Sequence, residues 1–395
     1  MIKLDTLADA LIGLKPVRVR PDRCLPALSP KAACSRCQAV CPENAVTLSP
    51  APVLNDCSAC GLCAAVCPSD AITLDDPSDQ ALLRRIADVA RRFDAVAITC
   101  EPTGLQGAHL VPVHCLGRIT PEFLVAAAAC GAERLELVMD RSRCGACPHQ
   151  EGGELLAAAV SQAQPVLTRL GFSCSVNVTQ TPGEPHPRRA ALAAPAPVQQ
   201  DRRSFLLAAL GLLRETTPAR LVGMGPQAAA QPNLQPLPEQ EWHKQPGVRS
   251  VRREMLRWAA QSRQPGADLS WPTPGVTLTG ACHLCGVCMA LCPNRAIAVV
   301  RTESNERLDH LPASCTGCGL CAAVCPSRAV TLTGSSPLVD LLEPQPRTLG
   351  SGTDNLCPVC GERFQAAVAP AVPTHTLCCL PCHLRTNPKG ALAHA

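Results

Sequence analysis

The sequence predicts a chain of several folded parts: two small α+β modules rich in cysteine, a parallel α/β domain between them, and a short cysteine-rich tail. Three observations lead to this prediction. The 395 residues exceed what one compact core usually organises. One cysteine unit recurs in two pairs, the first N-terminal and the second C-terminal. The 27 cysteines accompany only 2% aromatic residues and no tyrosine, so metals or cross-links must help to stabilise the small modules.

Composition and charge argue against several classes of protein. The first residues, MIKLDTLADALIGLKPVRVR, contain neither a continuous apolar segment nor a small-residue cleavage site, so we expect no export signal and a cytoplasmic location. In that compartment, cysteine clusters bind metal more often than they form disulfides. No apolar stretch approaches the roughly 20 residues that span a bilayer. The net charge of +4 is scattered, which predicts no nucleic-acid partner.

The recurring unit has the spacing C-x2-C-x2-C-x3-C-P, followed by a polar turn and a β-branched segment. Complete copies begin at Cys57, Cys282 and Cys315. Two residues between cysteines allow one tight loop to direct three thiolates at a single cluster, and the fourth cysteine ligates the cluster of the partner copy. Residues about 20–75 and 275–335 therefore resemble bacterial two-cluster ferredoxins. The resemblance implies two α+β ferredoxin-like domains, expected at residues 1–78 and 271–340.

Crossed ligation assigns every cysteine of the second module. Each [4Fe-4S] cluster takes three cysteines from one copy and the last cysteine of the other. The two predicted sets are Cys282, Cys285, Cys288 and Cys325, and Cys315, Cys318, Cys321 and Cys292. Zinc knuckles are the alternative, which the spacing disfavours because zinc sites usually close with two separated ligand pairs.

The first copy in the N-terminal module is incomplete. It reads CSRCQAVCP, and Lys31 stands where the first cysteine would be. Cys24 is the predicted replacement, because the intervening loop LPALSPKAA is long enough to bring it to the cluster. The two predicted sets are Cys24, Cys34, Cys37 and Cys67, and Cys57, Cys60, Cys63 and Cys41. The alternative is a [3Fe-4S] cluster with Cys24 as a bystander.

Residues 79–180 alternate predicted helices with short, apolar, β-rich strands. The strands are expected at 94–99, 108–113 and 134–139, and the helices at 78–93, at 120–130 and from about Glu154. Thr120 can cap the second helix, with Pro121 in its first turn. A parallel sheet of this kind binds ligands at the carboxyl ends of its strands.

Four cysteines follow these strand ends: Cys100, Cys115, Cys144 and Cys147. Four thiolates suit a [2Fe-2S] cluster, although zinc or a [4Fe-4S] cluster accepts the same set. Cys130, on the apolar face of a predicted helix, and Cys174 are interpreted as ordinary buried thiols.

Sequence segments in this central domain also resemble a known family. CEPTG, VPVHCLGRITPEFLVAAAACGAERLELV and RSRCGACPHQEGG are similar to the iron–sulfur delta subunit that links methyl-viologen-reducing hydrogenase to heterodisulfide reductase. The resemblance covers residues 95–170 and implies a [2Fe-2S] cluster that passes electrons between larger redox subunits. One departure is Thr103, because members of that family tend to have another cysteine soon after the first.

Residues 181–270 are rich in proline, alanine and glutamine, which predicts a semi-extended linker. Two helices are expected within it, at 202–215 and 250–263, each packing an apolar face on a neighbour. The segment DRRSFLLAALGLL also resembles a twin-arginine export motif, but such signals act at an N-terminus.

The tail, residues 341–395, contains two separated C-x2-C pairs, which are typical of a zinc ribbon. The predicted zinc ligands are Cys357, Cys360, Cys379 and Cys382, with Cys378 and His383 as alternatives. A structural or docking role is preferred to nucleic-acid binding, because no basic or aromatic stripe accompanies the pairs.

These motifs predict a multi-cluster electron-transfer protein with four [4Fe-4S] clusters, one [2Fe-2S] cluster and one zinc ion. It would relay electrons between a soluble donor and an oxidoreductase complex of hydrogenase, heterodisulfide reductase or formate dehydrogenase type. We expect no substrate site of its own, because no nucleotide-binding motif or hydrolytic triad is present. The first alternative is an accessory or assembly protein in which the clusters are structural. A nucleic-acid-binding zinc adaptor ranks third.

Overall fold

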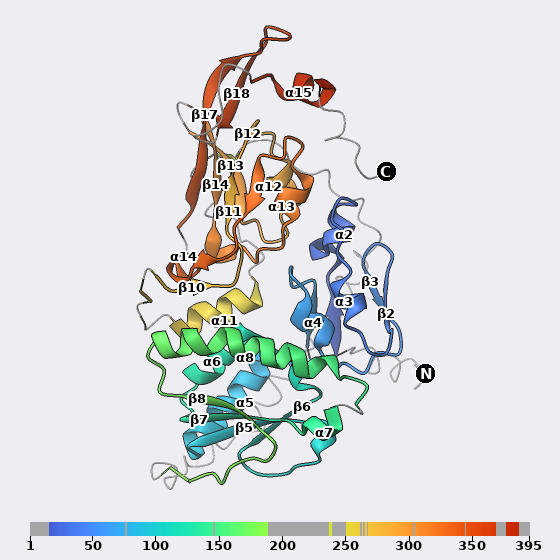
Figure 1. Ribbon diagram of the computed structural model, residues 1–395, viewed down its shortest axis with the longest axis vertical. Coiled ribbons are helices and arrows are strands. Elements are labelled where there is room, and N and C mark those ends of the chain that lie inside the picture. Colours follow the sequence, from blue (N-terminus) through green and yellow to red (C-terminus); the bar gives the residue numbers. More distant parts are fainter. Residues whose placement is uncertain are drawn as a thin grey trace, which may run out of the picture.

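The fold is a mixture of α and β elements, as predicted. The computed structural model describes residues 16–75, 77–144, 147–188, 237–238, 250–260, 263, 265–266, 268–302, 305–343, 345–368 and 377–386. Figure 1 shows the central domain at one end of an elongated molecule and a C-terminal hairpin at the other, with the N-terminal module alongside.

The N-terminal module is built from two short antiparallel strand pairs and three short helices. Strand β1 pairs with β4, and β2 pairs with β3. The elements are β1 Val17–Val19, α2 Leu25–Leu28, α3 Arg36–Ala39, β2 Val46–Leu48, β3 Pro52–Leu54, α4 Leu62–Val66 and β4 Ile72–Leu74. Helices α3 and α4 each end just before a Cys-Pro pair, because proline cannot continue a helix. Gly61 precedes α4 with a φ of 88°, a left-handed conformation that favours glycine.

The second module repeats this arrangement. Strand β11 pairs with β15, and β13 pairs with β14. Its elements are β11 Val276–Leu278, β12 Ala281–Cys282, α12 Val287–Leu291, β13 Ile297–Arg301, β14 Glu306–His310, α13 Leu320–Val324 and β15 Val330–Leu332. Strand β10, Ser270–Trp271, precedes the module and pairs with β16, Ser336–Pro337, which follows it. Helix α14, Leu338–Leu342, comes directly after β16.

The tail does not stand apart from this module. Its hairpin consists of β17 Arg347–Leu356 and β18 Arg363–Val368, and a short helix follows, α15 Leu380–Thr386. Strand β17 pairs with β14, and β18 pairs with β12, so the hairpin extends the sheet of the second module. The resulting six-stranded order is β12-β18-β17-β14-β13-β9, where β9 is Leu237–Pro238. Backbone pairing therefore joins the predicted zinc-ribbon region to the ferredoxin-type region.

The central domain has a four-stranded parallel sheet of order β6-β5-β7-β8. Its elements are α5 Asp79–Arg92, β5 Ala95–Cys100, β6 Leu110–Val113, α6 Pro121–Ala129, β7 Arg134–Val138, α7 Arg141–Cys144, α8 Glu151–Arg169 and β8 Ser175–Thr179. The three expected strands and three expected helices are confirmed, and the Thr120 hydroxyl caps α6 by accepting from the Phe123 N–H at 3.3 Å. Strand β8 was not predicted, although Cys174, Val176 and Val178 alternate with polar residues, a pattern typical of a half-buried strand.

Helix α11, Val251–Ala260, links the parts of the molecule. Its buried Met255, Leu256 and Ala259 belong to the core cluster of the central domain, which also contains Phe123 and Leu124 of α6. Figure 1 shows α11 between the second module and helices α6 and α8. The docking expected for residues 250–263 is therefore confirmed within α11. The helix expected at 202–215 lies outside the described residues.

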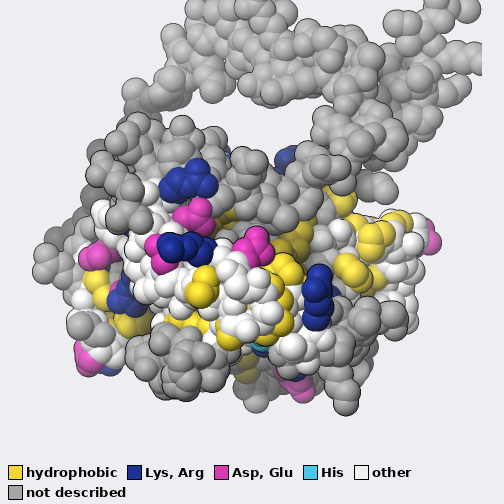
Figure 2. All heavy atoms as spheres, turned by 90° about the horizontal axis from the view of Figure 1, so that it is seen from above, with side chains coloured by type: hydrophobic (Ala, Val, Ile, Leu, Met, Phe, Trp, Pro, Cys, Tyr) yellow, Lys and Arg dark blue, Asp and Glu magenta, His cyan; other side chains and the backbone are white. Residues whose placement is uncertain are grey.

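The surface of the described residues carries both signs of charge. Figure 2 shows basic and acidic side chains interspersed on the face seen from above. A mixed surface of this kind creates no strong field of one sign on that face. Among the helices that the structure describes, none is long and apolar enough to cross a membrane.

Candidate iron–sulfur sites

The structure brings together both crossed cysteine sets of the second module. One small cavity is lined by Cys315, Cys318, Cys321 and Cys292. A second is lined by Cys282, Cys285, Cys288 and Cys325. Each cavity takes three cysteines from one copy of the motif and the last from the other, which is the arrangement that crossed ligation requires.

Electrostatics in this module fit a metal-bound state. Burial raises the pKa of the Cys318 thiol to about 12, and the neighbouring Cys292 adds to the effect. Burial likewise raises the pKa of Cys282 to about 12, with Cys325 as a contributing neighbour. Thiolates this crowded are stable only when cations share their charge, and sulfur donors are the set that soft metal ions and iron–sulfur clusters prefer. The residues therefore fit a cluster in each cavity.

Backbone N–H groups point at the sulfur atoms at equivalent places in the two modules. The amide four residues after the last cysteine of a copy donates to that sulfur at 3.2 Å, as Ala71 to Cys67 and Ala296 to Cys292. Another amide donates to the first cysteine of the following copy, as Gly317 to Cys315 at 3.4 Å. Hydrogen bonds to sulfur stabilise thiolate ligands and tune cluster potentials.

The structure places Cys24 with the three motif cysteines of the first site. Cys24 is 6% exposed and packs in one cluster with Cys37 and Cys67. Burial raises the pKa of the Cys37 thiol to about 11, and the charges that add to this effect come from Cys67, Cys34 and Cys24. These four thiols are therefore close neighbours, as a four-ligand site requires.

The second site of the N-terminal module is gathered in the same way. Burial raises the pKa of the Cys63 thiol to about 12, with contributions from Cys60, Cys57, Cys37 and Cys41. Three of these four neighbours are the predicted co-ligands of Cys63. The fourth, Cys37, belongs to the first site, so the two sites of this module are adjacent.

The four cysteines of the central domain converge at the carboxyl edge of its sheet. Cys100, Cys115, Cys144 and Cys147 line one cavity of about 50 Å³. Thr103, the position at which the resembling family tends to have cysteine, lines the same cavity. Its hydroxyl donates to the Cys100 carbonyl at 2.8 Å. The threonine thus supports the strand end that carries the first candidate ligand.

Two histidines at this site were missed by the motif search. His114 and His149 line the cavity, with ring centroids 5.8 Å apart. His149 Nε2 lies 3.4 Å from the Ser58 hydroxyl and 3.8 Å from a Glu43 carboxylate oxygen in the N-terminal module. Their positions next to Cys115 and two residues after Cys147 were the only sequence signal available.

Two junctions bring candidate sites of different domains next to one another. At one junction, Cys60 of the N-terminal module is close enough to act on the Cys115 thiol, whose pKa is raised mainly by burial. At the other, Cys34 and Cys318 pack against one apolar cluster that spans the two modules. That cluster contains buried Leu25, Ala32, Leu320 and Val324. Sites from all three domains therefore adjoin.

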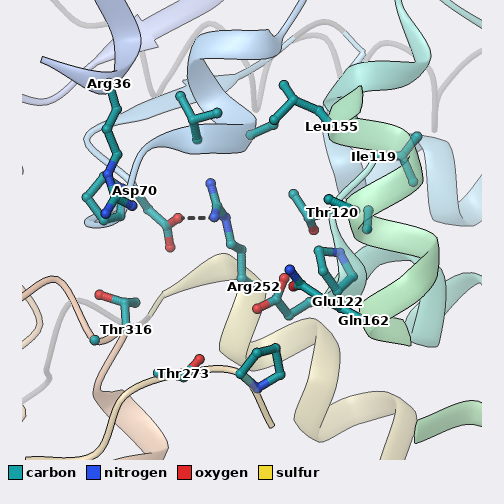
Figure 3. A pocket seen from close by; sticks show the side chains of 18 of the residues that line it. Arg36, Asp70, Ile119, Thr120, Glu122, Leu155, Gln162, Arg252, Thr273 and Thr316 are labelled. Carbon is teal, nitrogen blue, oxygen red and sulfur yellow. Dashed lines mark ion pairs between the residues drawn. The ribbon is translucent and has the colours of Figure 1, made fainter. Parts of the chain in front are cut away.

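Consecutive arginines on α11 fasten the two modules to the central domain. Arg252 Nε pairs with Asp70 at 3.1 Å in the N-terminal module, as Figure 3 shows. Arg253 Nε donates to the Cys315 carbonyl at 3.0 Å in the second module. Both arginines line a cavity of about 900 Å³, whose walls carry acidic and basic side chains, including Glu122. This mixture favours no single class of ligand.

The four predicted zinc ligands also meet. The sulfur atoms of Cys357, Cys360, Cys379 and Cys382 all lie within 4.8 Å of one another. Burial acts to raise the pKa of the Cys357 thiol, but N–H donors from Cys379, Cys360 and Val359 outweigh it and lower the pKa to about 6. Four thiols of this arrangement fit a tetrahedral zinc ion.

The two alternative zinc ligands, Cys378 and His383, lie beside the site, where Cys378 packs against Cys357, Cys379 and Cys382. The Cys378 carbonyl lies 3.0 Å from His283 Nε2, and the rings of His283 and His383 are 5.3 Å apart. His283 follows Cys282 of the second module. The tail therefore covers the loop that carries the outermost candidate cluster.

Comparisons with known proteins give two matches. A model described as a 4Fe-4S dicluster domain matches residues 281–329, and one described as a 4Fe-4S binding domain matches residues 52–73. No curated protein and no solved structure matches the chain significantly. The two matches support [4Fe-4S] clusters in both cysteine modules and point to iron–sulfur electron transfer. Neither match includes the central domain or the tail, so the individual ligand sets, the [2Fe-2S] cluster and the zinc ion stay predictions.

Proposed function

We propose that this chain is an electron relay whose five iron–sulfur sites lie in series between a soluble donor and an oxidoreductase complex. The order follows the contacts: the Cys282 set, the Cys315 set, the Cys24 set, the Cys57 set and the Cys100 set. The observation that carries the proposal is the shared apolar cluster of Cys34 and Cys318, which joins two modules far apart in sequence. Without that junction the chain would hold two separate redox units.

The chain's own residues hold, insulate and tune the sites. When bound, the clusters accept and release single electrons. Buried side chains such as Leu320 and Val324 exclude water at the junction, which lowers the local dielectric constant. Amide donors to Cys67 and Cys292 stabilise the ligated sulfur atoms.

We further propose that the oxidoreductase partner docks at the central domain. The support is its resemblance to a subunit that joins a hydrogenase to heterodisulfide reductase, together with the position of the Cys100 set at the end of the series. At the opposite end the tail covers the Cys282 loop through β18 and His283. The tail then serves as a zinc-stabilised docking element for the donor.

Metal analysis of anaerobically purified protein tests the proposal. We expect iron and acid-labile sulfide for four [4Fe-4S] clusters and one [2Fe-2S] cluster, with one zinc ion, and EPR signals that appear on reduction. An electron relay must cycle repeatedly between oxidised and reduced states with its iron retained. Clusters that fall apart on cycling would favour the accessory-protein alternative. Zinc without acid-labile sulfide would overturn the relay.

A further inference from the structure

Arg23 is a buried cation at the junction of the two modules. It is 2% exposed and is among the largest fully buried side chains of the described residues. Its Nε atom has no hydrogen-bond partner among the described residues, and no carboxylate there lies within ion-pair distance of its guanidinium. A buried charge destabilises the fold unless an opposite charge compensates it. We therefore expect an opposite charge close to Arg23.

A chain of hydrogen bonds leads from Arg23 into the second module. Arg23 Nη2 donates to the Asn294 side-chain carbonyl, and Asn294 Nδ2 donates to the Thr316 hydroxyl at 3.0 Å. Arg23 precedes Cys24, Asn294 follows Cys292 by two residues, and Thr316 follows Cys315. The path thus connects the ligand loop of the Cys24 set to that of the Cys315 set.

The two carboxylates that act on Arg23, those of Asp70 and Asp22, each pair with another arginine. Asp70 is the strongest opposing charge, but its carboxylate pairs with Arg252 and also accepts a hydrogen bond from Ser250. Asp22 pairs with Arg20 at 3.2 Å. Cys67, a predicted ligand of the Cys24 set, is the remaining acidic neighbour. A cluster held by four thiolates carries negative charge, and cluster potential depends on nearby charge.

We infer that Arg23 is a positioning and tuning residue for electron transfer between the two inner clusters, an inference that rests on the proposed relay. Its guanidinium serves as a counter-charge for the Cys24 cluster and, through the Asn294 and Thr316 loop, for the Cys315 cluster, where Arg253 is a second cation. A fixed cation stabilises the electron gained when either cluster is reduced, so it raises both reduction potentials. The hydrogen bonds through Asn294 and Thr316 hold the two ligand loops in register across the junction.

The test is an EPR-monitored redox titration of the full-length, anaerobically loaded protein and its Arg23→Met variant. We expect two of the [4Fe-4S] signals to titrate at lower potential, with at least a tenfold fall in the reduced-to-oxidised ratio at fixed potential. For a one-electron couple a tenfold change corresponds to 59 mV. The other clusters should titrate unchanged. Arg23→Lys, which keeps the charge, should return both potentials most of the way to those of the unmodified protein.

Arg18→Met is the matched control, because Arg18 lies on β1 of the same module with its side chain 65% exposed and paired to Asp75. It should shift no potential. Unchanged potentials in Arg23→Met at full iron content would overturn the inference, as would an equal shift of every cluster. If Arg23→Met loses iron, Arg23→Gln is compared with Arg23→Lys instead. Identical titrations of these two variants would overturn the inference. An unmodified protein that cannot be reduced reversibly would instead contradict the relay itself.

Discussion

Cys24 brings a thiol to a site where the motif lacks one. It stands at the N-terminus of α2, and its thiol lies in the same buried cluster as Cys37 and Cys67. The motif position, Lys31, lies later in the chain, so Cys24 reaches the site from outside the motif. The replacement of the missing ligand by Cys24 stays a prediction.

We predict that Cys24→Ser converts one four-iron cluster to a three-iron cluster or removes it, because serine is a poor ligand for soft iron–sulfur clusters. Iron analysis and EPR of the oxidised protein measure this change. Cys130→Ser is the control, since the Cys130 thiol donates to backbone carbonyls of Ala126 and Leu83. Equal iron content and identical signals in the two variants would remove Cys24 from the ligand set.

Gly152, in the first turn of α8, allows Cys115 to reach the central site. A Cβ at this position would lie 2.5 Å from the Cys115 sulfur, whereas a Cβ at Gly153 would meet only Met139 Sδ at 3.7 Å. We predict that Gly152→Ala displaces the sulfur and reduces cluster content at the central site, while Gly153→Ala retains it. Iron and sulfide content with the visible spectrum distinguishes them. Full cluster content in Gly152→Ala would show that Cys115 is not a ligand.

At the scale of elements, helix α11 contacts all three domains, although it lies in a segment that the sequence predicts to be a proline-rich linker. Its apolar face belongs to the central core, and its arginines reach Asp70 in one module and the Cys315 carbonyl in the other. The helix therefore fixes how three separately folded parts meet. Periodicity alone predicts the apolar face, but not which surface it contacts.

We predict that Leu256→Ala lowers the free energy of unfolding by roughly 2–5 kcal/mol, the usual cost of truncating a fully buried leucine. Leu256 is 0% exposed, whereas Trp258 on the same helix is 46% exposed. Trp258→Ala should therefore change stability by much less. Denaturant unfolding followed by far-UV circular dichroism measures both variants. A similar loss in each would show that α11 is not anchored by its core face.

At the scale of the whole molecule, the tail and the second module form one sheet. Strand β17 pairs with β14 and strand β18 pairs with β12, which ends at Cys282. The tail thus couples a metal site to the outer end of the proposed relay. Its tip exposes Leu356 and Val359, which are 67% and 63% exposed beside the zinc-site cysteines.

We predict that Cys382→Ser abolishes zinc binding and speeds oxygen damage to the outer cluster, because the loosened tail no longer covers the Cys282 loop. Total iron in anaerobic preparations should be unchanged, since the zinc site shares no ligand with the clusters. Zinc analysis and the decay of visible absorbance in air test this. Cys378→Ser should behave as the unmodified protein, because only the carbonyl of Cys378 contacts His283. Loss of zinc in Cys378→Ser would show that Cys378 is a zinc ligand.

The sequence by itself determined the cysteine modules and the three central strands, and it predicted a grouping for each candidate ligand set, with alternatives at Cys24 and at the zinc site. Those features depend on local rules: fixed cysteine spacing, apolar periodicity and the common edge shared by parallel strand ends. Only the tertiary structure decided that Cys34 meets Cys318, that Arg23 lies between two sites, and that the tail hairpin completes the sheet of the second module. The first two contacts join segments hundreds of residues apart. All three depend on shape and burial between surfaces that no local pattern encodes.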